Sequence, residues 1–230
     1  MKPLFERTAR VVGEAGAEKL AGASAAVFGI GGVGSYAAEA LVRAGVGRLF
    51  FIDSDAVEET NLNRQLVADL STLGRPKAEV MAERAARVNP DCRAEALVRR
   101  YAPGDEAWLA ALAPDFVIDA VDDVPAKVSL AEACARLGIP EASSMGTGNR
   151  LRPELLTVSD IYATSVDPLA RRMRRELRAR GVARLTAVWS RENPVKTGAG
   201  AVGSVSFVPP AAGMILAGLA VRSILGEESL

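Results

Sequence analysis

The first half of the chain alternates short apolar runs with longer segments in which apolar residues recur every three or four positions. The clearest example is an apolar run at 24–30 that ends in glycines, a helix-patterned segment up to about residue 45, and a strand-like run at 48–53. This order predicts one β-α-β unit. The alternation continues, with strands predicted at 93–99, 115–121 and 139–144 and helices at 76–89, 105–112 and 125–138. Strands separated by helices predict an α/β fold with a doubly wound, mostly parallel sheet and helices on both faces.

From about residue 145 the pattern changes. A glycine-rich turn and a strand-like piece at 146–161 precede a helix at 168–180, which Asp167-Pro168 opens and Gly181 closes. The chain is completed by a strand at 184–190, a Gly- and Pro-rich stretch at 191–204 and an apolar helix at 209–221. We expect the Gly- and Pro-rich stretch to be a mobile loop.

These patterns divide the chain into a core at 1–145 and a C-terminal strand/helix extension at 146–230, within one continuous domain. The apolar helix ends at Arg222, after fewer residues than the roughly 20 that a membrane-spanning helix needs. We expect it to be buried or to form an interface, and peripheral contact with a membrane surface is the alternative. The N-terminus meets acidic residues before any apolar run, so it is not a signal peptide. The sequence therefore predicts no integral membrane segment.

The amino-acid composition excludes several kinds of catalytic and metal site. The chain has no histidine, which excludes Ser-His-Asp and Cys-His nucleophile pairs and histidine metal ligands. Its two cysteines are too few for a disulfide framework or a four-thiolate zinc site, so we expect a reducing, cytoplasmic location. The 28 basic residues balance the 28 acidic ones, so binding to nucleic acid would need a local basic patch.

The strongest motif is a glycine-rich loop between the first predicted strand and helix. It has the pattern G-x-G-x-x-G, with glycines at Gly29, Gly31, Gly32 and Gly34. Glycines at these places let the backbone approach a phosphate, while the helix N-terminus supplies N–H donors. Asp53, at the end of the next strand, can hold ribose hydroxyls. The loop predicts nucleotide binding and by itself favours NAD, and a glycine-rich turn without a ligand is the alternative.

The loop after Asp53 argues against a dinucleotide. It brings polar residues to the same carboxyl edge of the sheet, namely Asn61, Asn63, Arg64, Gln65 and Lys77. The two cations among them suit a triphosphate, because Arg chelates phosphate oxygens and Lys acts as a point charge. Asp122 follows the strand at 115–121, where a carboxylate can hold Mg²⁺ together with phosphate oxygens and water. Alternatively, Asp122 caps the helix that starts near Pro125, and Lys77 faces solvent.

Five motifs in this order resemble the adenylating superfamily of ubiquitin-activating enzymes and their bacterial MoeB and ThiF relatives: the glycine loop, DSD (53–55), NLNRQ (61–65), GRPKAEVMAERAARVNP (74–90) and DAVDD (119–123). Members bind ATP with Mg²⁺ on a Rossmann-like fold and adenylate a carboxylate. The resemblance implies that ATP is held by the four glycines, Asp53, Asp55, Asn61, Arg64, Gln65 and Lys77, and Mg²⁺ by Asp122. It also implies that Arg7 reaches the neighbouring active site of a homodimer.

Segments 146–182 and 203–218 are similar to the tRNA threonylcarbamoyladenosine dehydratase branch of that superfamily. This branch uses ATP to cyclise the threonylcarbamoyl group on the adenosine beside the anticodon. The chain lacks the paired C-x-x-C ligands and the crossover-loop cysteine usual in branches that adenylate a ubiquitin-like sulfur carrier, and carrier adenylation is the alternative. The resemblance leaves a sulfur-relay protein open as a further partner. An NAD-dependent oxidoreductase and a non-enzymatic adaptor are the competing classes.

Positive charge is concentrated in the extension. Residues 150–196 contain eleven basic and five acidic residues. Five of the arginines fall within one predicted helix: Arg171, Arg172, Arg174, Arg175 and Arg178. Such density predicts binding to a nucleic-acid phosphate backbone, here tRNA, and a solvated helix face is the alternative.

Overall fold

The computed structural model describes residues 3–196, 198 and 202–227. The described strands form one seven-stranded sheet in the order β3-β2-β1-β4-β5-β7-β6. The strands are β1 (Ser24–Phe28), β2 (Arg48–Ile52), β3 (Arg93–Leu97), β4 (Phe116–Asp119), β5 (Glu141–Ser144), β6 (Leu156–Asp160) and β7 (Thr186–Ser190). All neighbours pair in parallel except β6, which runs antiparallel to β7 at the edge. The predicted doubly wound, mostly parallel sheet is confirmed.

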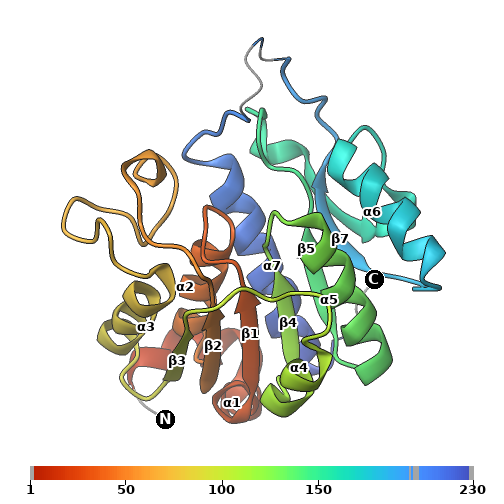
Figure 1. Cartoon of the computed structure of the whole chain (residues 1–230). Helices are drawn as coiled ribbons and strands as arrows, with labels where there is room; N and C mark the ends of the chain where they lie inside the picture. Colours follow the sequence, from red (N-terminus) through yellow and green to blue (C-terminus); the bar gives the residue numbers. More distant parts are fainter. Residues whose placement is uncertain (1–2, 197, 199–201, 228–230) are drawn as a thin grey trace.

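Seven α-helices cover the sheet in the described part of the chain. They are α1 (Glu6–Gly22), α2 (Gly34–Ala44), α3 (Lys77–Val88), α4 (Glu106–Leu112), α5 (Val124–Leu137), α6 (Pro168–Ala179) and α7 (Val208–Leu225). In Figure 1, α4 and α5 lie in front of the sheet and α2 and α7 behind it. Short 3-10 helices lie at Pro3–Phe5, Glu59–Asn61, Pro153–Leu155 and Ile161–Ala163.

Alternate residues of the central strands enter two separate cores. Val27 and Phe51 pack on the face covered by α2, α3 and α7. Phe28 and Phe50 pack on the opposite face, under α4 and α5. All four side chains are fully buried. The central strands are therefore apolar throughout, as expected for a parallel sheet covered on both faces.

The apolar helix α7 belongs to the core. It packs most extensively against α2, and a Cβ added at Gly213 would lie 2.3 Å from the carbonyl oxygen of Val33. Although α7 is long and apolar enough to cross a membrane, half of it is buried inside the protein. This confirms the prediction of a buried helix, and peripheral membrane contact has no support in the structure.

The extension completes the sheet that the core begins. It supplies β6 and β7, and β7 pairs with β5 of the core. A third core, between α5, α6 and β7, contains Ala170, Met173 and Leu177. The predicted mobile loop at 191–204 lies partly outside the described residues. Its described beginning is hydrogen-bonded, from the Arg191 N–H to the Leu155 carbonyl (3.0 Å) and from the Val195 N–H to the Asn149 carbonyl (2.7 Å).

Candidate active site

A pocket of about 530 Å³ lies at the carboxyl ends of the central strands. This volume falls in the usual range for small-molecule sites, and the carboxyl edge is where open α/β sheets bind ligands. The pocket is lined by most of the predicted nucleotide-binding residues: Gly29, Gly31, Gly32, Asp53, Asp55, Arg64, Gln65, Lys77 and Asp122. Residues far apart in the sequence therefore meet at one place.

The glycine loop lines the pocket, and at two of its positions the backbone leaves no room for a Cβ. Gly29 has a φ of +86°, and a Cβ there would lie 2.7 Å from the carbonyl oxygen of Ala120. A Cβ at Gly34, the first residue of α2, would lie 1.7 Å from the carbonyl oxygen of Gly29. These close approaches hold the loop against the strand ends and point the N-terminus of α2 toward the pocket, where an anion is stabilised.

Asp53 fixes the loop from the end of β2. Its Oδ2 accepts the Ile30 N–H (2.6 Å) and its Oδ1 accepts the Asp55 N–H (2.8 Å). Burial outweighs these bonds and raises the pKa of Asp53 above its ordinary value. Because each carboxylate oxygen can accept a further hydrogen bond, Asp53 can still receive ribose hydroxyls, as predicted.

Lys77 is a buried cation at the start of α3. The residue is 6% exposed, and its Nζ lies 3.3 Å from Asp55 Oδ2 in the pocket. The alternative in which Lys77 faces solvent is therefore wrong. A lysine with a single exposed carboxylate as partner retains donors for a phosphate.

Arg64 and Gln65 come from the long loop after β2. The Arg64 stem packs on Gly32, and its Nη1 donates to the Thr60 carbonyl and to Asn63 Oδ1, at 3.0 Å each. Gln65 Oε1 is buried and has no hydrogen-bond partner in the described structure. An unpaired amide oxygen beside the pocket fits a ligand that donates a hydrogen bond.

Asn61 is placed differently from the other predicted residues. It is buried, and it does not line the pocket. Its Oδ1 accepts the Glu58 N–H (3.1 Å) in a capping box that shapes the loop carrying Arg64. In the structure Asn61 therefore shapes the loop that carries Arg64, and direct contact between Asn61 and a phosphate stays a prediction.

Asp122 lines the pocket as an exposed carboxylate, without a hydrogen bond or ion pair in the described structure. The neighbouring Asp123 caps α5 by accepting the Ala126 N–H (3.0 Å), so the alternative that Asp122 is the cap is wrong. Among the described residues no three Asp, Glu, His or Cys side chains group as a metal site. One free carboxylate beside a phosphate pocket nevertheless fits Mg²⁺, which takes one or two carboxylates and completes its shell with phosphate oxygens and water.

The pocket lining that the sequence did not predict includes two segments at the ends of strands. One is Arg99–Tyr101, after β3, where the Arg99 guanidinium stacks 3.8 Å above the Trp108 ring. The other is Ser144–Gly148, which begins at the last residue of β5. Both follow parallel strands, and that position at the carboxyl edge was the available signal.

The two cysteines lie away from this chemistry. Cys92 and Cys134 are both buried and unpaired. Burial raises the pKa of Cys92 to about 11 and the pKa of Cys134 still further. A buried thiol with a raised pKa is a poor nucleophile, so Cys134 behaves as the core residue that its sequence position suggests.

The predicted basic helix, α6, is amphipathic. Its buried side contains Ala170, Met173 and Leu177, and four arginines are exposed: Arg171, Arg172, Arg175 and Arg178. Arg174 is different, because its Nη1 donates to the Thr164 carbonyl (3.0 Å) and hydroxyl. Arg175 pairs with Glu176 at 2.8 Å. Leu169, near the start of α6, lines the pocket, and the exposed arginines follow it along the same helix.

Arg7 lies near the start of α1, exposed to solvent and outside the pocket lining of its own chain. A role for Arg7 in this pocket would therefore need a second subunit.

Comparisons with known proteins agree with this geometry. A family profile described as the ThiF family matches residues 5–229. The tRNA threonylcarbamoyladenosine dehydratase of Bacillus subtilis is 37% identical over 97% of this chain and 95% of that protein. The crystal structure of Escherichia coli tRNA N6-threonylcarbamoyladenosine dehydratase in complex with ATP has a TM-score of 0.91 at 36% identity, covering 97% of this chain and 94% of that one. The E. coli sulfur carrier protein ThiS adenylyltransferase is 35% identical over 59% of this chain and 55% of that protein.

Proposed function

Because the chain belongs to the ThiF family, we propose that it adenylates the threonyl carboxylate of threonylcarbamoyladenosine in tRNA, which then cyclises with net loss of water. The similarity to a tRNA threonylcarbamoyladenosine dehydratase over 97% of the chain is the observation that carries this proposal. The pocket supports it independently, since it combines a glycine loop, a buried lysine and a free carboxylate.

In the proposed reaction, ATP activates the carboxylate of the substrate. A carboxylate is a poor electrophile, because its charge is delocalised and its oxygen leaves badly. In the proposed reaction a carboxylate oxygen attacks the α-phosphorus of ATP, the bond to the bridging oxygen breaks, and pyrophosphate leaves. Lys77 and Arg64 neutralise the negative charge that develops on the phosphates. Mg²⁺, when bound at Asp122, would add further neutralisation.

The second step needs no protein nucleophile. The ureido group of the substrate attacks the acyl carbon of its own acyl-adenylate, a new ring bond forms, AMP leaves with one carboxylate oxygen, and the ureido N–H proton passes to water. Since this attack is intramolecular, correct positioning supplies much of the rate, and no protein thiol or histidine is required. The lack of histidine and the burial of both cysteines are compatible with this route.

The partners follow from the same proposal. The exposed arginines of α6 would bind the phosphate backbone of the tRNA. Arg7 would enter the pocket of a second subunit in a homodimer. A cytoplasmic location fits a tRNA substrate, and docking of a sulfur-relay protein is an additional hypothesis.

Adenylation of a ubiquitin-like sulfur carrier is the second candidate. The likeness to the ThiS adenylyltransferase favours it, although that likeness covers only 59% of the chain. Both reactions release pyrophosphate from ATP, but only carrier adenylation needs a protein with a C-terminal Gly-Gly.

The test supplies the purified chain with ATP, Mg²⁺ and tRNA that bears threonylcarbamoyladenosine. The tRNA is then digested, and the masses of its nucleosides are measured by mass spectrometry. We expect loss of one water from the modified adenosine, together with AMP and pyrophosphate. Pyrophosphate release only with a Gly-Gly carrier protein, and none with the tRNA, would favour the second candidate.

A further inference from the structure

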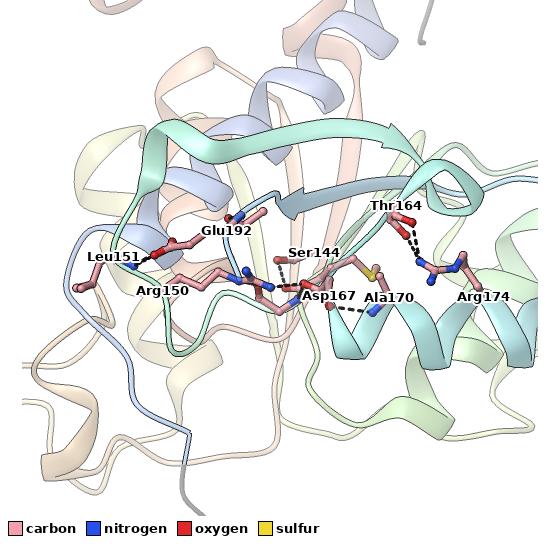
Figure 2. Close-up of polar contacts among 11 residues, drawn as sticks. Ser144, Arg150, Leu151, Thr164, Asp167, Ala170, Arg174 and Glu192 are labelled. Atoms are coloured by element: carbon pink, nitrogen blue, oxygen red, sulfur yellow. Dashed lines mark hydrogen bonds and ion pairs between the residues drawn. The ribbon is translucent and has the colours of Figure 1, made fainter. Parts of the chain in front are cut away.

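The segment that follows β5 connects the nucleotide pocket to the basic helix. Gly146, Thr147 and Gly148 line the pocket. Four residues after Gly146, the side chain of Arg150 points toward Asp167, directly before the first residue of α6 (Figure 2). The mechanism above uses neither Arg150 nor its partner Asp167.

Arg150 and Asp167 form a buried ion pair. Arg150 Nη2 lies 2.9 Å from Asp167 Oδ2, and the two side chains are 1% and 0% exposed. Arg150 Nη1 is also buried, with no hydrogen-bond partner in the described structure. Replacing a buried ion pair by apolar residues is often neutral or stabilising, so stability alone does not account for it.

The pair holds both backbone polar groups of Gly146. The Gly146 N–H donates to Asp167 Oδ2 at 3.1 Å, and the Gly146 carbonyl accepts Arg150 Nε at 3.0 Å. The carboxylate also packs closely on this glycine, because a Cβ there would lie 3.2 Å from Asp167 Oδ2. The orientation of the peptide groups around Gly146 is therefore set by two side chains.

Asp167 acts at the same time on the basic helix. Its Oδ1 accepts the Ala170 N–H at 2.9 Å, which caps the first turn of α6. One carboxylate thus contacts the pocket segment and the helix that carries the exposed arginines. From the other side, Glu192 accepts the N–H groups of Leu151 (3.1 Å) and Arg152 (3.0 Å), as Figure 2 shows for Leu151.

We propose that Arg150 and Asp167 are positioning residues, which lock the pocket segment 146–148 to the first turn of α6. This inference rests on the proposed function. RNA bound along α6 would then present its reacting carboxylate at a fixed place relative to ATP in the pocket. The pair would act on the reaction step and leave the affinity for either substrate almost unchanged, since in the described part of the chain no hydrogen bond or ion pair joins either side chain to a predicted phosphate-binding residue.

The test separates positioning from binding. Arg150→Met removes the ion pair and the bond to the Gly146 carbonyl, and Asp167→Asn removes the charge while asparagine still caps the helix. We expect kcat to fall roughly 100-fold in Arg150→Met, because small misplacements of reacting groups have effects of this size. The dissociation constants for ATP and for tRNA should change less than about twofold. Arg150→Lys, which restores the charge, should recover part of kcat.

The matched control is Arg84→Met, which removes one partner of the buried Glu39 carboxylate between α2 and α3. It should lower stability without lowering kcat more than about twofold. The proposal is wrong if Arg150→Met has the kcat of this control, or if its affinity for ATP falls as much as its kcat.

Hydrogen exchange gives a readout that does not depend on turnover. In Arg150→Met, the amides of 146–148 should exchange faster in the presence of ATP, while those of the glycine loop 29–34 keep their rates. Unchanged exchange at 146–148 would contradict the proposal. Failure of the wild-type chain to turn over modified tRNA would instead contradict the proposed function, and the exchange result would still decide whether the pair holds the segment.

Discussion

The two walls of the nucleotide pocket are built in different ways. On one wall, Gly29 and Gly34 allow backbone to lie against backbone, and the contacts are the carbonyl groups of Ala120, directly after β4, and of Gly29 itself. On the other wall, Gly146 is held by Arg150 and by Asp167, which is 21 positions away. The first wall depends on missing side chains and the second on a charged pair brought together by the fold.

The different construction of the two walls suits them to different ligands. A wall made of backbone N–H groups and a helix N-terminus suits phosphate, whatever the second substrate is. A wall fixed by side chains from the extension can be adapted to one substrate. We therefore propose that the first wall binds ATP and that the second places the RNA substrate, and the following predictions test this division.

The largest effect is expected on the first wall. Lys77→Ala removes the buried cation of the pocket and should lower the rate of adenylation about 10²–10³-fold, because the charge of the departing pyrophosphate is no longer neutralised. The measurement is tRNA-dependent release of pyrophosphate. Glu79→Ala, an exposed position on the same helix, is the control. A near-normal rate in Lys77→Ala would refute the site assignment.

The next effect concerns the backbone contact itself. Gly29→Ala places a Cβ 2.7 Å from the Ala120 carbonyl oxygen at a φ of +86°, so we expect the free energy of unfolding to fall by about 2–3 kcal/mol. Urea denaturation measures this change. Gly22→Ala, where an added Cβ meets nothing within 4 Å, should change the free energy of unfolding by less than about 0.5 kcal/mol. Equal free energies of unfolding for the two variants would show that the glycine loop can accommodate a Cβ at position 29.

A smaller effect is expected beside the second wall. Reversing Arg171, Arg172 and Arg175 to Glu should weaken tRNA binding roughly tenfold and reduce the slope of log K against log salt by about 2–3. Binding would be measured between low and moderate salt, with Arg87→Glu on α3 as the control. ATP affinity should not change. An unchanged slope of log K against log salt would show that these arginines of α6 do not contact the RNA.

The smallest effect concerns Glu141, at the start of the strand that leads to the second wall. Its Oε1 is buried without a partner in the described structure, and burial, with the nearby Asp119 carboxylate, raises the pKa of Glu141 well above its ordinary value. The Glu141 carboxyl therefore binds a proton more tightly in the folded chain than in the unfolded chain. Its contribution to the free energy of unfolding is favourable at low pH and is lost as the pH rises through the pKa of the folded state.

Glu141→Gln should remove that dependence. We expect its free energy of unfolding to exceed that of the wild type by more at pH 8 than at pH 5.5. Urea denaturation at both values measures the difference. A difference that is the same at both pH values would show that Glu141 titrates normally.

The sequence predicts the first wall much better than the second. The glycine loop, Asp53 and Lys77 lie in local motifs whose spacing implies their geometry, so their meeting at the sheet edge could be expected. The Arg150–Asp167 contact depends on the packing of α6 against the rest of the protein, and no local pattern encodes it. The sequence identifies Asp167 only as the residue that opens a helix. Arg174 was expected to bind RNA, but its bond to Thr164 depends on how the preceding loop folds back.

The central claim is that an oxygen of the substrate carboxylate attacks the α-phosphorus of ATP. The direct measurement uses tRNA whose threonyl carboxylate carries ¹⁸O at both oxygens, and follows the label by mass spectrometry after one turnover. Our account predicts one ¹⁸O in the phosphate of AMP for each nucleoside cyclised, and none in pyrophosphate. Label in inorganic phosphate with formation of ADP, or cyclised nucleoside without labelled AMP, would contradict it.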